Sequence, residues 1–157
     1  MIEAQPLAEG QMAPAFEITI QDGTTRSLSD YAGRKLALYF YPKDMTPGCT
    51  VQACNLESNS DALARAGVEI LGVSSDAAAR HQKFIDKFSL GFDLGADEDR
   101  SVQKAFGVWG KKKFMGREFE GTHRVTFLID EDGKIASVIL KAKVKDHSSQ
   151  ILEGFGI

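Results

Sequence analysis

Apolar residues along the chain fall into short continuous runs and stretches with helical spacing. The run LALYFY, residues 36–41, is short, continuously apolar and rich in aromatic residues. These properties favour a buried central strand over a helix of ordinary length. The next apolar positions recur with helical spacing and predict a helix from about Pro47 to Ala66. These positions are Val51, Leu56 and Leu63.

The rest of the chain predicts further short strands and helices. Two apolar runs, VTFLID and KIASVIL, flank Glu131-Asp132-Gly133, which is a strong hairpin signal. Five other elements are predicted in chain order: a hairpin around Gly23, a strand VEILGV from Val68, a helix near Ala77 to Phe88 with Ser75 and Asp76 as cap candidates, a weak strand near Phe92, and a short helix after Asp97. A terminal helix bearing Ile151, Leu152 and Phe155 closes the chain.

This order of elements predicts an α/β fold. A β-α-β-α unit followed by a β-hairpin and a helix is similar to the thioredoxin fold, with a central mixed sheet flanked by helices and an N-terminal β-hairpin. No internal repeat, low-complexity tract or interior linker interrupts the chain. We therefore expect residues 1–157 to form a single domain with the end of the central strand at the functional site.

Composition limits the possible functions. A chain of 157 residues can bury roughly 70 % of its unfolded surface, so its two cysteines are not needed as a structural staple. The formal charge of −3, with mixed signs along the chain, argues against nucleic acid and anionic membranes as partners. The N-terminus MIEAQPLAEG lacks the features of a secretory signal, and no apolar run is long enough to span a membrane. We expect a protein of the reducing cytoplasm.

The segment YPKDMTPGCTVQACN, residues 41–55, contains both cysteines. Thr46 is a good N-cap and Pro47 suits the first helical position, so Cys49 is predicted to lie in the first turn of the helix. Unpaired backbone N–H groups and the helix dipole favour a thiolate there.

Thiolate formation alone explains only a small gain in reactivity. Lowering a cysteine pKa from about 8.5 to about 6 raises the thiolate fraction at pH 7 about 30-fold. The lower basicity then costs roughly tenfold in nucleophilicity. If the chain is a fast catalyst, other groups must stabilise charge in the transition state.

The spacing of the two cysteines predicts a conformational change. Residues five apart in an intact helix have Cα atoms roughly 8.5 Å apart, whereas a disulfide needs less than about 7 Å. A disulfide between Cys49 and Cys54 therefore requires the first turns of the helix to unwind.

Two sequence blocks carry a resemblance to a known family. Pro42, Thr46 and Cys49 reproduce the P-x-x-x-T-x-x-C pattern of peroxiredoxins, and PKDMTPGCTVQAC resembles the bacterioferritin comigratory protein (PrxQ-like) subgroup. The block VWGKKKFMGREFEGTHRVTFLIDEDGKI, residues 108–135, is similar to the second signature of that subgroup. The resemblance extends over nearly the whole chain.

The resemblance implies a role for each site residue. Cys49 would be the peroxidatic nucleophile and Cys54 the resolving cysteine, giving a sulfenic acid and then an intramolecular disulfide that thioredoxin or a glutaredoxin-like dithiol protein reduces. Arg124 would favour the thiolate and hold the peroxide. Thr46 would offer its hydroxyl to the peroxide oxygens, and Pro42 would shield the thiolate from water.

Each of these residues also has a structural interpretation. Cysteines are often small core residues, and Cys54 could pack in the helix while an external thiol resolves Cys49. Thr46 could serve only as an N-cap, Pro42 could simply end a strand, and Arg124 could be an ordinary arginine at a strand end.

Other candidate chemistry is poorly supported by the sequence. His81, His123 and His147 show no tight ligand spacing with one another or with the cysteines, so we expect no metal and no cofactor. Lys111 to Lys113 could dock an acidic partner but are more typical of a solvated loop.

Three functions are therefore weighed. The leading one is a thioredoxin-dependent thiol peroxidase acting on hydrogen peroxide and organic hydroperoxides, which we expect to be a monomer, with a weak dimer as the alternative. The second is a general thiol-disulfide oxidoreductase, although the C-x-x-C spacing is missing. The third is a non-catalytic thioredoxin-fold binding module with incidental cysteines.

Overall fold

The computed structural model describes residues 1–157 and contains a seven-stranded mixed sheet. Its strand order is β2-β1-β5-β4-β3-β8-β9, and a separate two-stranded hairpin is formed by β6 and β7. The central strands β3, β4 and β5 are parallel, and the outer strands pair antiparallel. The strands are β1 (Glu17–Ile20), β2 (Thr25–Ser27), β3 (Lys35–Phe40), β4 (Val68–Ser74), β5 (Asp93–Ala96), β6 (Trp109–Phe114), β7 (Arg117–Thr122), β8 (Thr126–Ile129) and β9 (Ile135–Ile139).

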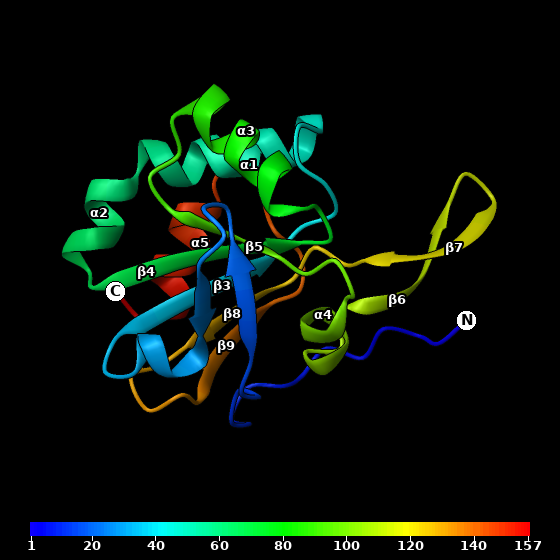
Figure 1. The fold of residues 1–157 in the computed structure, drawn as a ribbon. Helices are drawn as coiled ribbons and strands as arrows, with labels where there is room; N and C mark the ends of the chain where they lie inside the picture. The colour runs from blue at the N-terminus through cyan, green and yellow to red at the C-terminus, as the bar shows by residue number, and fades with distance from the viewer.

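Helices cover both faces of the seven-stranded sheet (Figure 1). One core contains side chains of α1, α2, α3 and α5, and the other contains side chains of η1 and α4. This arrangement confirms the predicted α/β fold with an N-terminal hairpin. The helices are the 3-10 helix η1 (Leu28–Tyr31) and the α-helices α1 (Pro47–Ser58), α2 (Ser60–Arg65), α3 (Ala78–Phe88), α4 (Ser101–Ala105) and α5 (His147–Gly154).

Strand β3 lies inside the sheet between β4 and β8. Leu36, Leu38 and Phe40 point into the core with η1 and α4, whereas Ala37 and Tyr39 point into the core with α1. The run is continuously apolar because both faces of the strand are buried. The prediction of a buried central strand is therefore confirmed, and a loop joins the carboxyl end of β3 to the helix that carries the first cysteine.

Three local predictions need correction. The helix predicted from Pro47 to Ala66 is two helices, because Asn59 has a non-helical backbone and its side chain donates to the Asn55 carbonyl at 2.8 Å. The N-cap of α3 is Ala77, without a side-chain cap. Neither of the two cap candidates fills that role, and the Asp76 carboxylate instead accepts from the Asp44 N–H at 2.8 Å.

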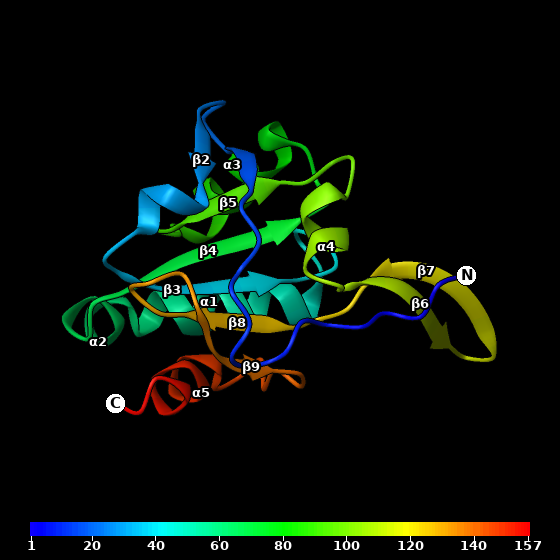
Figure 2. The ribbon, with the colours of Figure 1, turned by 90° about the horizontal axis from the view of Figure 1, so that it is seen from below.

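The third correction concerns the segment predicted to be a solvated loop. Lys111 to Lys113 lie in β6, which pairs with β7 and projects from the body of the molecule (Figures 1 and 2). Met115 and Gly116 form its turn with φ of 51° and 78°, the left-handed geometry of a tight hairpin. The N-terminal segment lies along this hairpin, where Lys111 N–H donates to the Ile2 carbonyl at 2.7 Å.

No helix in the protein has both the length and the apolar character needed to cross a membrane.

Candidate active site

Cys49 is the third residue of α1, immediately beyond the loop that follows β3. Its side chain is 2 % exposed and packs in the core formed with α1, α2, α3 and α5. Pro47 occupies the first helical turn, as predicted, and Thr50 N–H makes the first helical bond to the Thr46 carbonyl at 2.9 Å. The sequence prediction that Cys49 lies at the amino end of a helix is therefore confirmed.

Thr46 occupies the N-cap position, but its hydroxyl does not cap the helix. The Oγ1 atom instead donates to the Lys43 carbonyl at 2.7 Å. The prediction from cap propensity is thus correct for the position and wrong for the hydrogen bond. Because Lys43 belongs to the same loop, the bond closes a compact turn just before Cys49 and leaves the α1 N–H groups free of a side-chain acceptor.

Arg124 reaches Cys49 from a distant part of the chain. It lies between β7 and β8, and its Nη2 atom donates to the Cys49 Sγ atom at 3.3 Å. Its Nη1 atom donates to the Gln52 Oε1 atom at 2.6 Å. The guanidinium is therefore fixed by two contacts to α1, one on the sulfur and one on a residue one turn further along.

Gln52 was not identified from the sequence, although its position three residues after Cys49 places it on the same side of the helix. It is completely buried, and its Nε2 atom has no hydrogen-bond partner. A buried amide with only one end paired is unfavourable for stability. Gln52 is therefore best explained by its contact with Arg124.

Lys112 adds a second cation to this part of the molecule. Its ammonium donates to the Thr122 carbonyl at 2.8 Å. Burial and the nearby charge of Arg124 lower the pKa of Lys112, and the charge of Cys49 acts in the opposite direction. The residue that the sequence placed in a solvated loop is thus half-buried and hydrogen-bonded to the end of β7.

Cys54 lies on α1 and Pro42 follows β3, as the sequence predicted. Both cysteines are free thiols; Cys54 is half-buried on the same intact helix. The helical geometry keeps the pair beyond disulfide distance. Pro42 is half-buried two residues after the end of β3.

The sequence of residues 9–138 matches the model of the AhpC/TSA family. Over 147 residues the chain is 48 % identical to peroxiredoxin Bcp of Escherichia coli (strain K12), covering 94 % of each chain. The chain belongs to the peroxiredoxin family.

Solved structures of peroxiredoxins agree with this assignment. Peroxiredoxin Q of Xanthomonas campestris superposes with a TM-score of 0.84 at 34 % identity, covering 90 % of this chain and 89 % of that one. The bacterioferritin comigratory protein of the same organism, described in a study of its alkyl peroxide reduction activity, superposes with a TM-score of 0.86 at 31 % identity, covering 97 % and 98 %. The resemblance to the bacterioferritin comigratory protein subgroup is therefore confirmed.

Family membership establishes this peroxiredoxin as a thiol peroxidase, with a peroxide substrate and a thioredoxin-like reductant. A general thiol-disulfide oxidoreductase and a non-catalytic binding module are not favoured. The spacing of the thiols agrees with this, because α1 carries Cys49 in its first turn and Cys54 more than one turn later.

A buried polar network fixes the loop that leads into the peroxiredoxin active site. Asp44 and His81 are both fully buried, and the His81 Nδ1 atom lies 2.6 Å from the Asp44 Oδ2 atom. His81 Nε2–H donates to the Gly95 carbonyl at 2.8 Å, and the Tyr41 hydroxyl donates to Asp44 Oδ1 at 2.5 Å. Burial raises the pKa of Tyr41 well above its ordinary value, so this hydroxyl stays protonated. The network connects the loop before Thr46 to α3 and β5.

None of the three histidines of the peroxiredoxin forms a hydrogen bond with either cysteine. His81 gathers with Asp44 and Asp76 closely enough to suggest a cation site. The groups facing it are already engaged, because Asp44 pairs with His81 and Tyr41 while Asp76 accepts from Ser74 and Arg80. His123 Nε2 donates to the Lys111 carbonyl at 3.0 Å. His147, the first residue of α5, is buried, and its Nε2 atom lies 2.8 Å from the Thr126 hydroxyl of β8.

Proposed function

We propose that Cys49 is the peroxidatic cysteine of this thiol peroxidase. Its thiolate attacks one peroxide oxygen, the O–O bond breaks, and the leaving oxygen takes a proton to become water or an alcohol while Cys49 becomes a sulfenic acid. The observation that carries this proposal is the Arg124 Nη2 contact with the Cys49 sulfur at 3.3 Å. A fixed cation beside the sulfur stabilises the thiolate and the charge that develops on the peroxide.

Thr46 and Pro42 have supporting roles in this proposal. Thr46 directly precedes α1, so its hydroxyl can turn from the Lys43 carbonyl to a peroxide bound above Cys49. Pro42 provides apolar cover on the loop, which limits the access of water to the thiolate. The buried position of Cys49 supports this shielding, because charge interactions are stronger where water is excluded.

Cys54 is proposed to resolve the sulfenic acid. Its thiol attacks the Cys49 sulfur, a disulfide forms, and the hydroxyl of the sulfenic acid leaves with a proton as water. Since both cysteines lie on the intact α1, the first turns of that helix must unwind for this step. A dithiol protein of the thioredoxin or glutaredoxin type then reduces the disulfide and is itself oxidised.

The finer assignments belong to the same proposal. The substrates are hydrogen peroxide and organic hydroperoxides; alkyl peroxide reduction by the Xanthomonas relative supports the second class. The chain acts as a single domain and as a monomer in the cytoplasm. The absence of a long apolar helix is compatible with that location.

The test is peroxide consumption coupled to thioredoxin and its reductase, with mass analysis of the protein after each equivalent of peroxide. The wild-type protein should consume peroxide and give a Cys49 to Cys54 disulfide. Cys49→Ser should consume none. Cys54→Ser should be oxidised once and then accumulate sulfinic acid without efficient turnover. Peroxide consumption retained in Cys49→Ser would reject the proposal for Cys49, and full thioredoxin-supported turnover in Cys54→Ser would reject the proposal for Cys54.

A further inference from the structure

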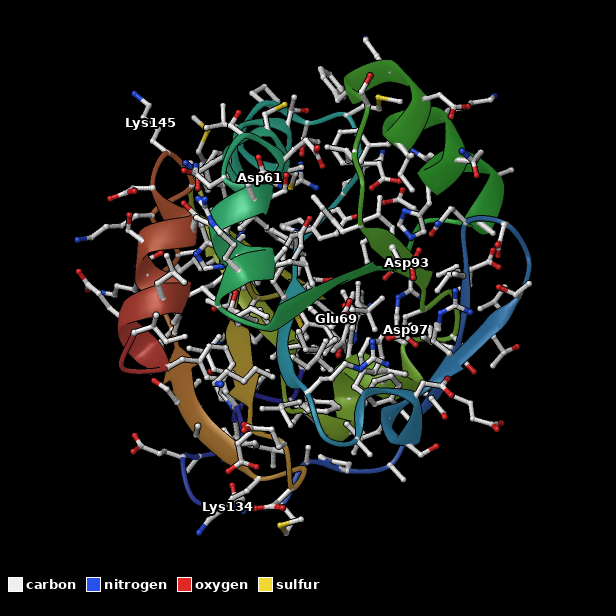
Figure 3. The ribbon with its side chains drawn as sticks, turned by 90° about the vertical axis from the view of Figure 1, so that its left-hand side faces the viewer. Asp61, Glu69, Asp93, Asp97, Lys134 and Lys145 are labelled. Atoms are coloured by element: carbon white, nitrogen blue, oxygen red, sulfur yellow. The ribbon has the colours of Figure 1, made fainter.

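Asn55, the residue directly after Cys54, joins α1 to the beginning of α5. Its Nδ2 atom donates to the Lys145 carbonyl at 3.0 Å, and its Oδ1 atom accepts from the Ser148 N–H at 2.9 Å. Lys145 lies in the loop just before α5, with its side chain directed away from the body of the molecule (Figure 3). One amide therefore uses both ends to hold two backbone groups about ninety residues further along the chain.

This contact restricts the part of α1 that the resolving step must move. Gln52 is held by Arg124, and Asn55 is held by the start of α5. Cys54 lies between these two attachments. For the Cys54 sulfur to approach Cys49, its backbone must leave helical register, and the neighbouring Asn55 resists that movement as long as both hydrogen bonds persist.

We propose that Asn55 is a positioning residue for the resolving step of this peroxiredoxin. By holding the helix on the far side of Cys54, it keeps the resolving thiol in helical register and prolongs the lifetime of the Cys49 sulfenic acid. The inference rests on the proposed roles of Cys49 and Cys54. The inference adds that the rate of disulfide formation depends partly on a contact with α5, outside α1, the helix that carries both cysteines.

The sulfenic acid has two fates, and the Asn55 contact influences which one prevails. Attack by the Cys54 thiol gives the disulfide and water. Attack by the sulfenate on a second peroxide breaks another O–O bond and gives a sulfinic acid with water or an alcohol. The first fate needs α1 to unwind, whereas the second proceeds in the intact helix. A stronger attachment of Asn55 therefore favours sulfinic acid at a given peroxide concentration.

The experiment compares the wild-type protein with Asn55→Ala and Asn55→Asp. After one equivalent of hydrogen peroxide, quenched-flow alkylation and mass analysis give the rate of disulfide formation. A peroxide titration during turnover with thioredoxin gives the concentration that converts half of the protein to sulfinic acid. Losing two hydrogen bonds in Asn55→Ala should raise both quantities about tenfold. Asn55→Asp keeps an acceptor for Ser148 but loses the donor to Lys145, so it should lie between the other two proteins.

Asn59→Ala is the matched control. Asn59 donates one hydrogen bond to the carbonyl of Asn55 within the same helical region and does not reach α5 through that bond. Its loss should leave the disulfide rate within about twofold of wild type, because a single part-buried hydrogen bond within the helical region has a small net value. The initial rate of Cys49 oxidation should be the same in all four proteins.

Three outcomes overturn the inference and can be told apart. A Cys49 to Cys54 disulfide that forms at the same rate in wild type and Asn55→Ala overturns the role of Asn55 alone. Absence of that disulfide in the wild-type protein overturns the resolving role of Cys54 and this inference with it. A general loss of helix stability would accelerate Asn59→Ala as much as Asn55→Ala, which would also contradict a specific role for the contact with α5.

Discussion

The Nη2 atom of Arg124 lies 3.3 Å from the Sγ atom of Cys49, although 75 positions separate the two residues in the chain. The contact exists because α1 begins at the carboxyl end of β3 and Arg124 immediately precedes the paired region of β8, the antiparallel neighbour of β3. The two strand ends lie side by side, and they bring the cation to the sulfur. The proposed peroxide site is thus assembled across the sheet.

Replacing Arg124 should slow the peroxide step strongly. Arg124→Ala removes the hydrogen-bonded cation beside Cys49, and we expect the second-order rate of oxidation by hydrogen peroxide to fall about 10²- to 10³-fold. Arg124→Lys keeps the charge but loses the two-pronged geometry, so it should recover only part of the rate. Stopped-flow measurement gives the rates. Arg117→Ala, at an exposed arginine in β7, is the control and should react at nearly the wild-type rate.

Replacing Gln52 should separate activity from stability. Gln52→Leu removes the acceptor that fixes Arg124 Nη1 and should reduce the rate of oxidation about tenfold, through misplacement of the guanidinium. The same change removes a buried amide nitrogen that has no partner, so the free energy of unfolding should not decrease by more than about 1 kcal/mol. Gln82→Leu, on α3, is the control. A rate equal to wild type in Gln52→Leu would show that Arg124 does not depend on this contact.

The buried Asp44 and His81 pair should behave as a coupled unit. His81→Leu leaves the Asp44 carboxylate buried without its imidazole partner and should lower the free energy of unfolding by about 3 kcal/mol. Adding Asp44→Asn removes the charge and keeps an acceptor for Tyr41, so the double variant should recover about half of that loss. Urea unfolding of the wild type, His81→Leu, Asp44→Asn and the double variant gives the coupling energy. Strict additivity of the two single changes would contradict the pairing.

Stability should fall as the solution is acidified, because of His147. Burial is the main cause that lowers the pKa of His147, the charge of Arg124 acts in the same direction, and the hydrogen bond to Gln150 opposes both. The unfolded chain therefore takes up a proton as the pH falls through about 6.5, while the folded protein still has neutral His147. The free energy of unfolding should decrease from pH 7.5 to 5.5.

Urea unfolding at several pH values between these limits tests this expectation. Each unit by which the folded pKa lies below the unfolded one contributes up to about 1.4 kcal/mol. His147→Gln should flatten the dependence. His123→Gln should leave it in place, because His123 lies on the loop after β7 and bonds the Lys111 carbonyl. An unchanged slope in His147→Gln would assign the effect to other groups.

Much of the fold could be predicted because its signals are local. The alternation of Leu36, Ala37 and Leu38 between two cores requires a continuous apolar run, and such a run marks a central strand. Thr46-Pro47 predicted the start of α1, because the propensity for the first helical turn is also a local signal that depends on neighbouring residues. The break at Asn59 was missed because asparagine is compatible with both a helix and a loop. The β6 and β7 hairpin was missed because its segments are rich in charged residues and largely exposed.

The active site was likewise predictable only in part from the sequence. Pro42, Thr46, Cys49, Cys54 and Arg124 could be named from the resemblance, but their contacts could not. The hydroxyl of Thr46 bonds to Lys43 instead of the helix, and this choice depends on how the loop is held. Gln52, Lys112, Asp44 and His81 gave no distinctive motif, since a glutamine, a lysine or a buried acid acquires its role only from a partner elsewhere in the chain.

By itself, the sequence predicted the setting of Cys49: a cysteine in the first turn of a helix after a buried strand, and a second cysteine five residues later that an intact helix keeps out of reach. These features follow from backbone geometry and short-range propensity. Only the tertiary structure decided that Arg124 contacts the sulfur, that Gln52 fixes its guanidinium, and that Asn55 attaches α1 to α5. Such contacts join residues separated by 72 to 93 positions, and they arise only when the sheet brings its strand ends and helices together.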